Sequence, residues 1–83
     1  MTNQAPSDAT EAAVFEAFAR VMGQTPPRGE ETVPGDVASW TSLTHVHLIA
    51  EIEGELGVEL PPKLLVNMGP LGDIVRAASA GAR

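Results

Sequence analysis

Proline and glycine divide the chain into helix-sized segments, and this division constrains the fold more than any other feature. Breaks stand at Gly23, Pro26-Pro27, Gly57, Pro61-Pro62 and Gly69-Pro70. Proline cannot continue a helix beyond its first turn, and glycine adopts the left-handed conformation in which many helices end. Between the breaks, apolar residues recur at helical spacing, with no strand-like alternation. We therefore expect an all-α four-helix bundle with three longer helices and one short helix.

The first helix is expected over residues 9–22, with Ser7 or Asp8 as its cap. Its apolar stripe consists of Val14, Phe15, Phe18, Val21 and Met22. Gly23 is the expected stop. Residues 24–39 then form a long loop between the first and second helices, and an ordered loop of this length is unusual enough in a compact domain to suggest a role.

The second helix is expected to begin at Thr41 or Ser42 and to end at Leu56, with Gly57 as its stop. At about 100° per residue, one broad side is apolar and is expected to face the core. That side holds Leu43, Val46, Ile49, Ala50, Ile52 and Leu56, with Leu48 at its border. The opposite side, which faces water or a partner, holds Thr44, His47, Glu51, Gly54 and Glu55.

The C-terminal part is expected to form a short helical turn over Lys63–Val66 and a last helix with Pro70 at its first position. The stripe of the last helix consists of Leu71, Ile74, Val75 and Ala78. We divide the chain into a flexible tail over 1–7, one folded domain over 8–78 and a second flexible tail over 79–83.

Length and charge narrow the possible functions. A chain of 83 residues holds one small core, and its 43% hydrophobic content favours a folded chain. The net charge of −6 argues against nucleic acid and anionic membranes as partners, since both need a cationic surface. The chain has no cysteine, which excludes a disulfide, a thiolate metal site and a cysteine nucleophile. Without a signal-peptide pattern or a long apolar run, a cytoplasmic protein is expected. We also expect it to be a monomer.

The acidic residues are concentrated in the middle of the chain. No Lys or Arg lies between Arg28 and Lys63, but seven of the eleven acids do: Glu30, Glu31, Asp36, Glu51, Glu53, Glu55 and Glu59. A field of one sign steers a basic partner toward one side of a protein. The alternative is a solvated face that keeps a small protein soluble.

The start of the second helix carries the motif Trp40-Thr41-Ser42-Leu43. Two further motifs come later in the chain: Leu56-Gly57-Val58 and Leu71-Gly72-Asp73. This arrangement resembles the acyl carrier protein family, whose hallmarks are Asp-Ser-Leu, then Phe/Leu-Gly-Val, then Val/Leu-Gly-Asp. The resemblance spans roughly residues 8–78 and is most specific over 40–60. It departs from the family at Thr41, where Asp is usual. Threonine still caps a helix but supplies no carboxylate to a modifying enzyme.

The resemblance implies that Ser42 is the attachment point of 4′-phosphopantetheine, which a phosphopantetheinyl transferase transfers from coenzyme A. The thiol of that arm would carry acyl groups as thioesters between enzymes, so the domain itself is not expected to be an enzyme. A phosphodiester fits there, because a helix N-terminus offers unpaired N–H groups and the positive end of the macrodipole. Alternatively, Ser42 is only a helix-start residue, and the protein is an unmodified helical adaptor of carrier fold that docks partner enzymes.

The resemblance also implies partners and cargo. Carriers of this family meet basic patches of acyl-loading and acyl-processing enzymes through the second helix, here Thr41, Leu43, His47, Ala50, Glu51, Glu53 and Glu55. A small cavity for the cargo would be lined by Ile49, Ile52, Leu64 and Val66. The Ala-, Gly- and Pro-rich composition and the unusual Thr41 favour polyketide or other specialised biosynthesis over housekeeping fatty acid biosynthesis.

Two histidines near Ser42 raise the question of hydrolytic or metal chemistry. His45 falls on the apolar side and His47 on the exposed side, about 200° apart on a helix, so they cannot share a metal ion. No third, orienting acid is placed by the pattern, which argues against a catalytic triad. Trp40 is expected to be a plug between the loop and the bundle, with a recognition role as the alternative.

Overall fold

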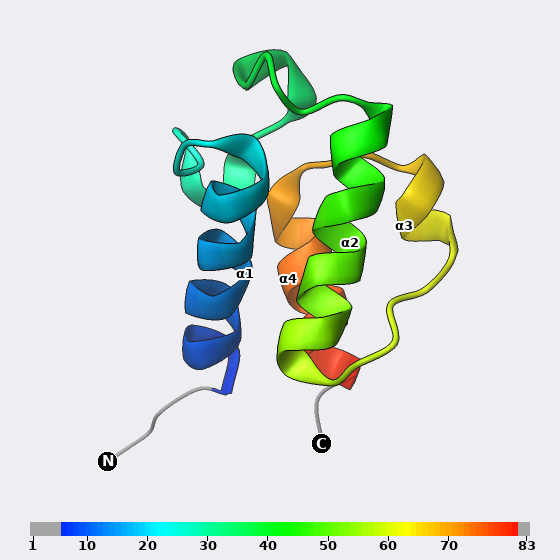
Figure 1. Cartoon of the computed structure of the whole chain (residues 1–83). Coiled ribbons are helices and arrows are strands. Elements are labelled where there is room, and N and C mark those ends of the chain that lie inside the picture. The colour runs from blue at the N-terminus through cyan, green and yellow to red at the C-terminus, as the bar shows by residue number, and fades with distance from the viewer. Residues whose placement is uncertain (1–5, 82–83) are drawn as a thin grey trace.

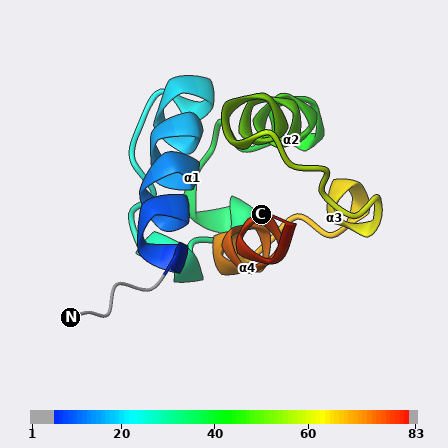
Figure 2. The same cartoon turned by 90° about the horizontal axis from the view of Figure 1, so that it is seen from below.

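The computed structural model describes residues 6–81, and this part of the chain is a helical bundle without strands. Its helices are α1 (Pro6–Met22), α2 (Ser42–Leu56), α3 (Lys63–Val66) and α4 (Leu71–Gly81). Figures 1 and 2 show α1, α2 and α4 around a common interior, with the short α3 at the edge beside α2 and α4. The predicted all-α bundle of three longer helices and one short helix is confirmed.

Helix α1 begins at Pro6, so the predicted N-terminal tail over 1–7 is too long by two residues. Proline is well suited to a helix start, because its missing N–H would have no intrahelical partner there. The predicted cap at Ser7 or Asp8 depends on side chains that are not among the described ones. Residues 1–5 lie outside the described part of the chain entirely. Gly23 ends the helix as expected, with φ +81° and an N–H bond of 2.9 Å to the carbonyl oxygen of Ala19.

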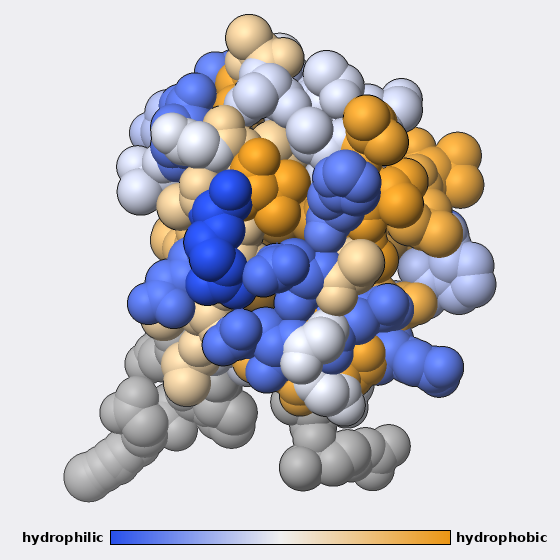
Figure 3. Space-filling view, viewed as in Figure 1, coloured by the Kyte–Doolittle hydropathy of each residue, from blue (hydrophilic) through white to orange (hydrophobic). Residues whose placement is uncertain are grey.

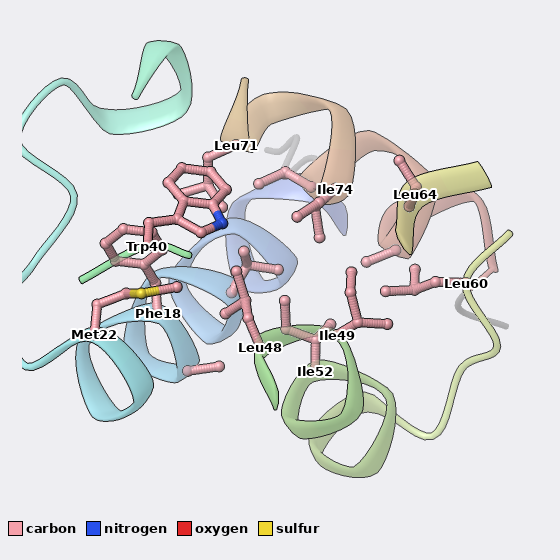
Figure 4. Close-up of a cluster of buried hydrophobic side chains, with 14 of the residues drawn as sticks. Phe18, Met22, Trp40, Leu48, Ile49, Ile52, Leu60, Leu64, Leu71 and Ile74 are labelled. Atoms are coloured by element: carbon pink, nitrogen blue, oxygen red, sulfur yellow. The ribbon is translucent and has the colours of Figure 1, made fainter. Parts of the chain in front are cut away.

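The core lies where α1, α2 and α4 meet. Its largest fully buried side chains include Phe18, Leu48, Ile52, Leu71 and Ile74, several of which are labelled in Figure 4. Trp40 is buried with them, and its ring meets that of Phe18 edge to face at 5.3 Å between centroids. The indole therefore fills the junction between loop and bundle, which confirms the predicted plug.

The loop between α1 and α2 is ordered by two 3-10 turns, Gly29–Glu31 and Pro34–Asp36. Thr32, between them, is fully buried, and its carbonyl oxygen accepts a bond of 2.9 Å from the N–H of Leu71 at the start of α4. At the end of the loop, the Ser39 hydroxyl donates to the carbonyl oxygen of Met22 at 2.8 Å. The loop is thus fixed to both α1 and α4, as expected of an ordered segment.

The buried face of α2 differs from the predicted one. His45, Leu48, Ile49 and Ile52 are buried, whereas Leu43, Val46 and Ala50 are exposed. Leu48, predicted at the border, has no exposed surface. The reason is the position of the neighbours: α1 and α4 cover the stripe centred on Leu48 and Ile52, and α3, with only four residues, is too short to cover the adjoining flank.

Helix α4 continues to Gly81, so the predicted C-terminal tail over 79–83 is wrong for residues 79–81. The link from α2 to α3 explains the extra turn, because Val58 and Leu60 are buried and Gly81 lies against Val58. Contacts with this link add packing that the local sequence does not reveal. Residues 82–83 lie outside the described part of the chain.

Candidate attachment and docking site

Ser42 is the first residue of α2, and its side chain is exposed. Thr41 caps the helix, as predicted: its hydroxyl oxygen accepts from the N–H of Thr44 at 3.3 Å. In return, the N–H of Thr41 donates to the Thr44 hydroxyl oxygen at 2.8 Å. This reciprocal capping box holds the backbone on both sides of Ser42.

The N–H groups of Ser42 and Leu43 have no acceptor within the described residues. The first intrahelical bond runs from the N–H of His45 to the carbonyl oxygen of Thr41, at 2.8 Å. The first turn of α2 contains no acidic residue that would repel an anion. Two free donors, the positive end of the helix dipole and an exposed hydroxyl therefore meet at Ser42, an arrangement that fits a phosphodiester.

The loop anchors this helix start. The Thr44 hydroxyl donates to the carbonyl oxygen of Ser39 at 2.6 Å, and Ser39 is itself bonded to the end of α1. Ser42 thus stands on a backbone that is tied to both α1 and the loop.

The two histidines of α2 lie apart, as predicted. His45 is fully buried, and both of its ring nitrogens have partners within the protein. His47 is exposed on the outer face. The structure does not bring either ring together with Ser42 in a hydrogen bond, and the described residues contain no group of three or more side chains suited to hold a metal ion.

The acidic side chains predicted for docking all have partners inside the protein. Glu51 and Glu55 face α1, where Arg20 contacts their carboxylates at 3.1 Å and 3.4 Å. The Glu53 carboxylate accepts the N–H of Leu60 at 2.8 Å and so holds the link between α2 and α3. Docking through these residues stays a prediction, but the acids are less free than the sequence indicates.

An exposed apolar surface lies next to the attachment site instead, where Figure 3 shows hydrophobic side chains over the upper part of α2 and over α3. It consists of Leu43 (67% exposed), Val46 (48%), Leu65 (46%) and Val66 (79%), and we call these four residues the apolar patch. The sequence analysis names Leu43 for docking, but it places Val46 on the core side and Val66 in the cargo cavity, and it does not single out Leu65. The signal was available, because a four-residue helix with three consecutive apolar residues can bury only one side.

The predicted cargo cavity is not formed as expected. Val66 points to solvent, while Ile49, Ile52 and Leu64 are packed in the core. Leu64 also lines a half-open hollow of about 410 Å³ between α3 and α4. Lys63 and Arg76 lie in the wall of this hollow.

No helix in the described residues has the length and apolar character needed to cross a membrane. Comparison of the chain with protein-family models, curated proteins and solved structures gave no match.

Proposed function

We propose that this chain is an acyl carrier protein that holds its cargo on a 4′-phosphopantetheine arm attached to Ser42. The observation that supports this most is the exposed serine at the first position of a capped helix, beside the free N–H groups of Ser42 and Leu43. The order of elements agrees with the resemblance, since a long ordered loop precedes this helix and a four-residue helix follows it.

The chain's own residues would bind and orient the phosphate rather than react. The free N–H groups of Ser42 and Leu43 would be the donors available to the phosphate, and the helix dipole would favour its negative charge. Thr41 keeps the helix start rigid through its capping box with Thr44. The bound arm supplies a thiol that carries the acyl group as a thioester. Activation of the Ser42 hydroxyl belongs to the transferase, because neither histidine is hydrogen-bonded to it.

The partners follow from this role. A phosphopantetheinyl transferase modifies Ser42, and acyl-loading and acyl-processing enzymes then dock near it. We place the carrier in polyketide or other specialised biosynthesis, on the strength of its composition and of Thr41.

The test is the mass of the protein after incubation with coenzyme A and a broad-specificity phosphopantetheinyl transferase. We expect intact-mass spectrometry to show a gain of one phosphopantetheine group in the wild type and none in Ser42→Ala. Thr25→Ala is the matched control, because Thr25 also carries a hydroxyl, is exposed in the loop between α1 and α2, and should leave the gain unchanged when it is replaced.

Two outcomes would contradict the proposal. If several transferases leave the wild-type mass unchanged, the unmodified adaptor of carrier fold is the better interpretation. If the gain persists in Ser42→Ala, the attachment site lies elsewhere.

A further inference from the structure

We propose that the hollow between α3 and α4 binds an organic carboxylate that carries a short apolar chain. The carboxylate would pair with Lys63 and Asn67, and its chain would lie against Leu64 and Ala77. This site does not depend on the modification of Ser42, so it goes beyond the proposed function.

The first step is the hollow itself. Figure 2 shows α3 beside α4, on the side of the bundle away from α1. Helix α3 packs mainly against α2, and the half-open hollow of about 410 Å³ lies between it and α4. Sites for small molecules usually have volumes of about 300 to 1,000 Å³. The hollow therefore has room for a small organic ligand.

The second step is its lining. Leu64 is buried, and together with Ala77 on α4 it gives the hollow an apolar surface. Lys63 begins α3 and Asn67 follows its last residue, and both line the same hollow. Residues four apart on a helix are neighbours on one face. The lining thus combines an apolar surface with two polar groups that lie close to each other.

The third step is that these two polar groups are free to bind a ligand. The Lys63 ammonium and the Asn67 side-chain amide take part in no hydrogen bond or ion pair with another described residue. The other basic side chains in this part of the chain all pair with acids, and they are Arg20, Arg28 and Arg76. Lys63 is therefore the one described cation whose charge the protein does not itself offset.

The fourth step is the charge of the ligand. Among the described residues of the lining, Asp73 is the only acid, and Arg76 contacts its carboxylate at 2.5 Å. Glu30 approaches Arg76 from the loop at 3.8 Å, so neither Asp73 nor Arg76 has an uncompensated charge. One ammonium and one amide donor match the two oxygens of a single carboxylate. A phosphate dianion would bring a second negative charge that the lining does not offset, in a protein of net charge −6.

The test uses the unmodified full chain, with sodium hexanoate as the probe. Titration of isotope-labelled protein, followed by NMR, should shift the amide signals of Leu64, Asn67 and Ala77, with a dissociation constant in the millimolar range. Hexanol has the same chain length without the charge, and it should bind about fivefold more weakly.

Variants separate the charge from the shape of the hollow. Lys63→Gln should weaken hexanoate binding about fivefold, whereas Lys63→Arg keeps the charge and should retain binding. Arg28→Gln is the matched control, because it lowers the net charge of the protein by the same amount outside the lining, and it should leave the affinity within about twofold. Ala77→Leu fills the hollow and should weaken the binding of both hexanoate and hexanol. Circular dichroism checks that each variant folds.

Loaded forms of the protein identify the source of the carboxylate. The transferase attaches a glutaryl-bearing arm from glutaryl-coenzyme A, or a pentanoyl-bearing arm of equal chain length from pentanoyl-coenzyme A. If the carboxylate belongs to the attached group, only the glutaryl form shifts the Leu64 and Asn67 amides, and it no longer binds hexanoate. If the carboxylate comes from solution, both forms bind hexanoate as the unmodified protein does. Either result supports the site.

Four results would overturn the inference. They are no chemical-shift change with hexanoate, equal affinities for hexanoate and hexanol, an unchanged hexanoate affinity in Lys63→Gln, and shifts at Leu43 and Val46 of the apolar patch in place of Ala77. None of them bears on the attachment of phosphopantetheine. Conversely, a chain that no transferase modifies should still bind hexanoate, so a failure of one proposal is distinguishable from a failure of the other.

Discussion

The indole Nε1 of Trp40 donates a hydrogen bond of 3.0 Å to Nδ1 of His45, and both side chains are buried. Because Nδ1 accepts this bond, the proton of the neutral imidazole lies on Nε2, which donates to the carbonyl oxygen of Leu64 at 2.5 Å. The two rings also stack, with their centroids 6.0 Å apart. A single buried imidazole thus connects the segment before Ser42 with α3.

Replacing His45 should therefore be costly. His45→Ala leaves a cavity and deprives both the Trp40 indole and the Leu64 carbonyl of their partner, and we expect it to lower the free energy of unfolding by about 3 to 5 kcal/mol. His45→Phe fills the space but leaves the same two groups unpaired, so a loss of about 2 to 3 kcal/mol is expected. Urea unfolding followed by circular dichroism measures both losses.

The second histidine of α2 provides the control for this prediction. His47→Ala removes an exposed ring from the same helix and should change the free energy of unfolding by no more than about 0.5 kcal/mol. Comparable losses in His45→Ala and His47→Ala would show that the buried connection has no special role in stability.

Two glycines near the end of α2 should respond in opposite directions to alanine. A Cβ at Gly54 or at Gly57 meets no atom within 4 Å, so only the backbone conformation separates the two positions. Gly54 is helical, and Gly54→Ala should stabilise the protein by about 0.5 to 1 kcal/mol. Gly57 ends the helix at φ 65°, and Gly57→Ala should cost about 1 to 2 kcal/mol. Urea midpoints of the two variants that shift in the same direction would contradict this account.

The bounds of α2 and α3 follow from local signals, which is why the sequence predicts them correctly. Thr41 offers a cap, Gly57 offers a left-handed stop, and Pro61-Pro62 separate the two helices. The buried face of α2 depends instead on where α1 and α4 lie, and an apolar stripe wide enough to include both Val46 and Leu48 does not say which of them is covered.

The candidate site likewise has local features that the sequence predicts and long-range features that it does not. The exposed serine at a helix start is a local feature, and the sequence places it. The partner of Glu51 and Glu55 is Arg20, thirty-one residues before Glu51, and no local pattern connects them. Exposed apolar residues on α3 could have been expected from its length, but their place beside Leu43 and Val46 could not, because the sequence does not specify how α2 and α3 are arranged.

Arg20 should contribute modestly to stability and should do so electrostatically. Its pairs with Glu51 and Glu55 are about half exposed, and such pairs are worth about 0 to 1 kcal/mol each. Arg20→Gln should therefore lower the free energy of unfolding by about 1 kcal/mol in low salt and by much less at about 1 M sodium chloride. Arg20→Lys, which keeps the charge, is the control. A loss in Arg20→Gln that stays the same in both salt conditions would assign the effect to packing of the arginine stem.

Thr41 is the residue at which a single change should improve modification. Aspartate caps a helix at least as well as threonine and places a negative charge near the positive end of the dipole, so Thr41→Asp should be as stable as the wild type or slightly more stable. Its carboxylate also gives the transferase a charged group beside Ser42. Because one charge-assisted contact is worth about 1.5 to 3 kcal/mol, kcat/KM for phosphopantetheine transfer should rise about tenfold or more.

Thr41→Asn separates the charge from the cap. Asparagine has nearly the shape of aspartate and caps a helix equally well, but it carries no charge, so it should leave kcat/KM near the wild-type value. An equal rise in both variants would attribute the gain to a firmer helix start. If kcat/KM rises in neither variant, the transferase does not use a carboxylate at this position. Having Thr41 in place of the usual aspartate would then not affect modification.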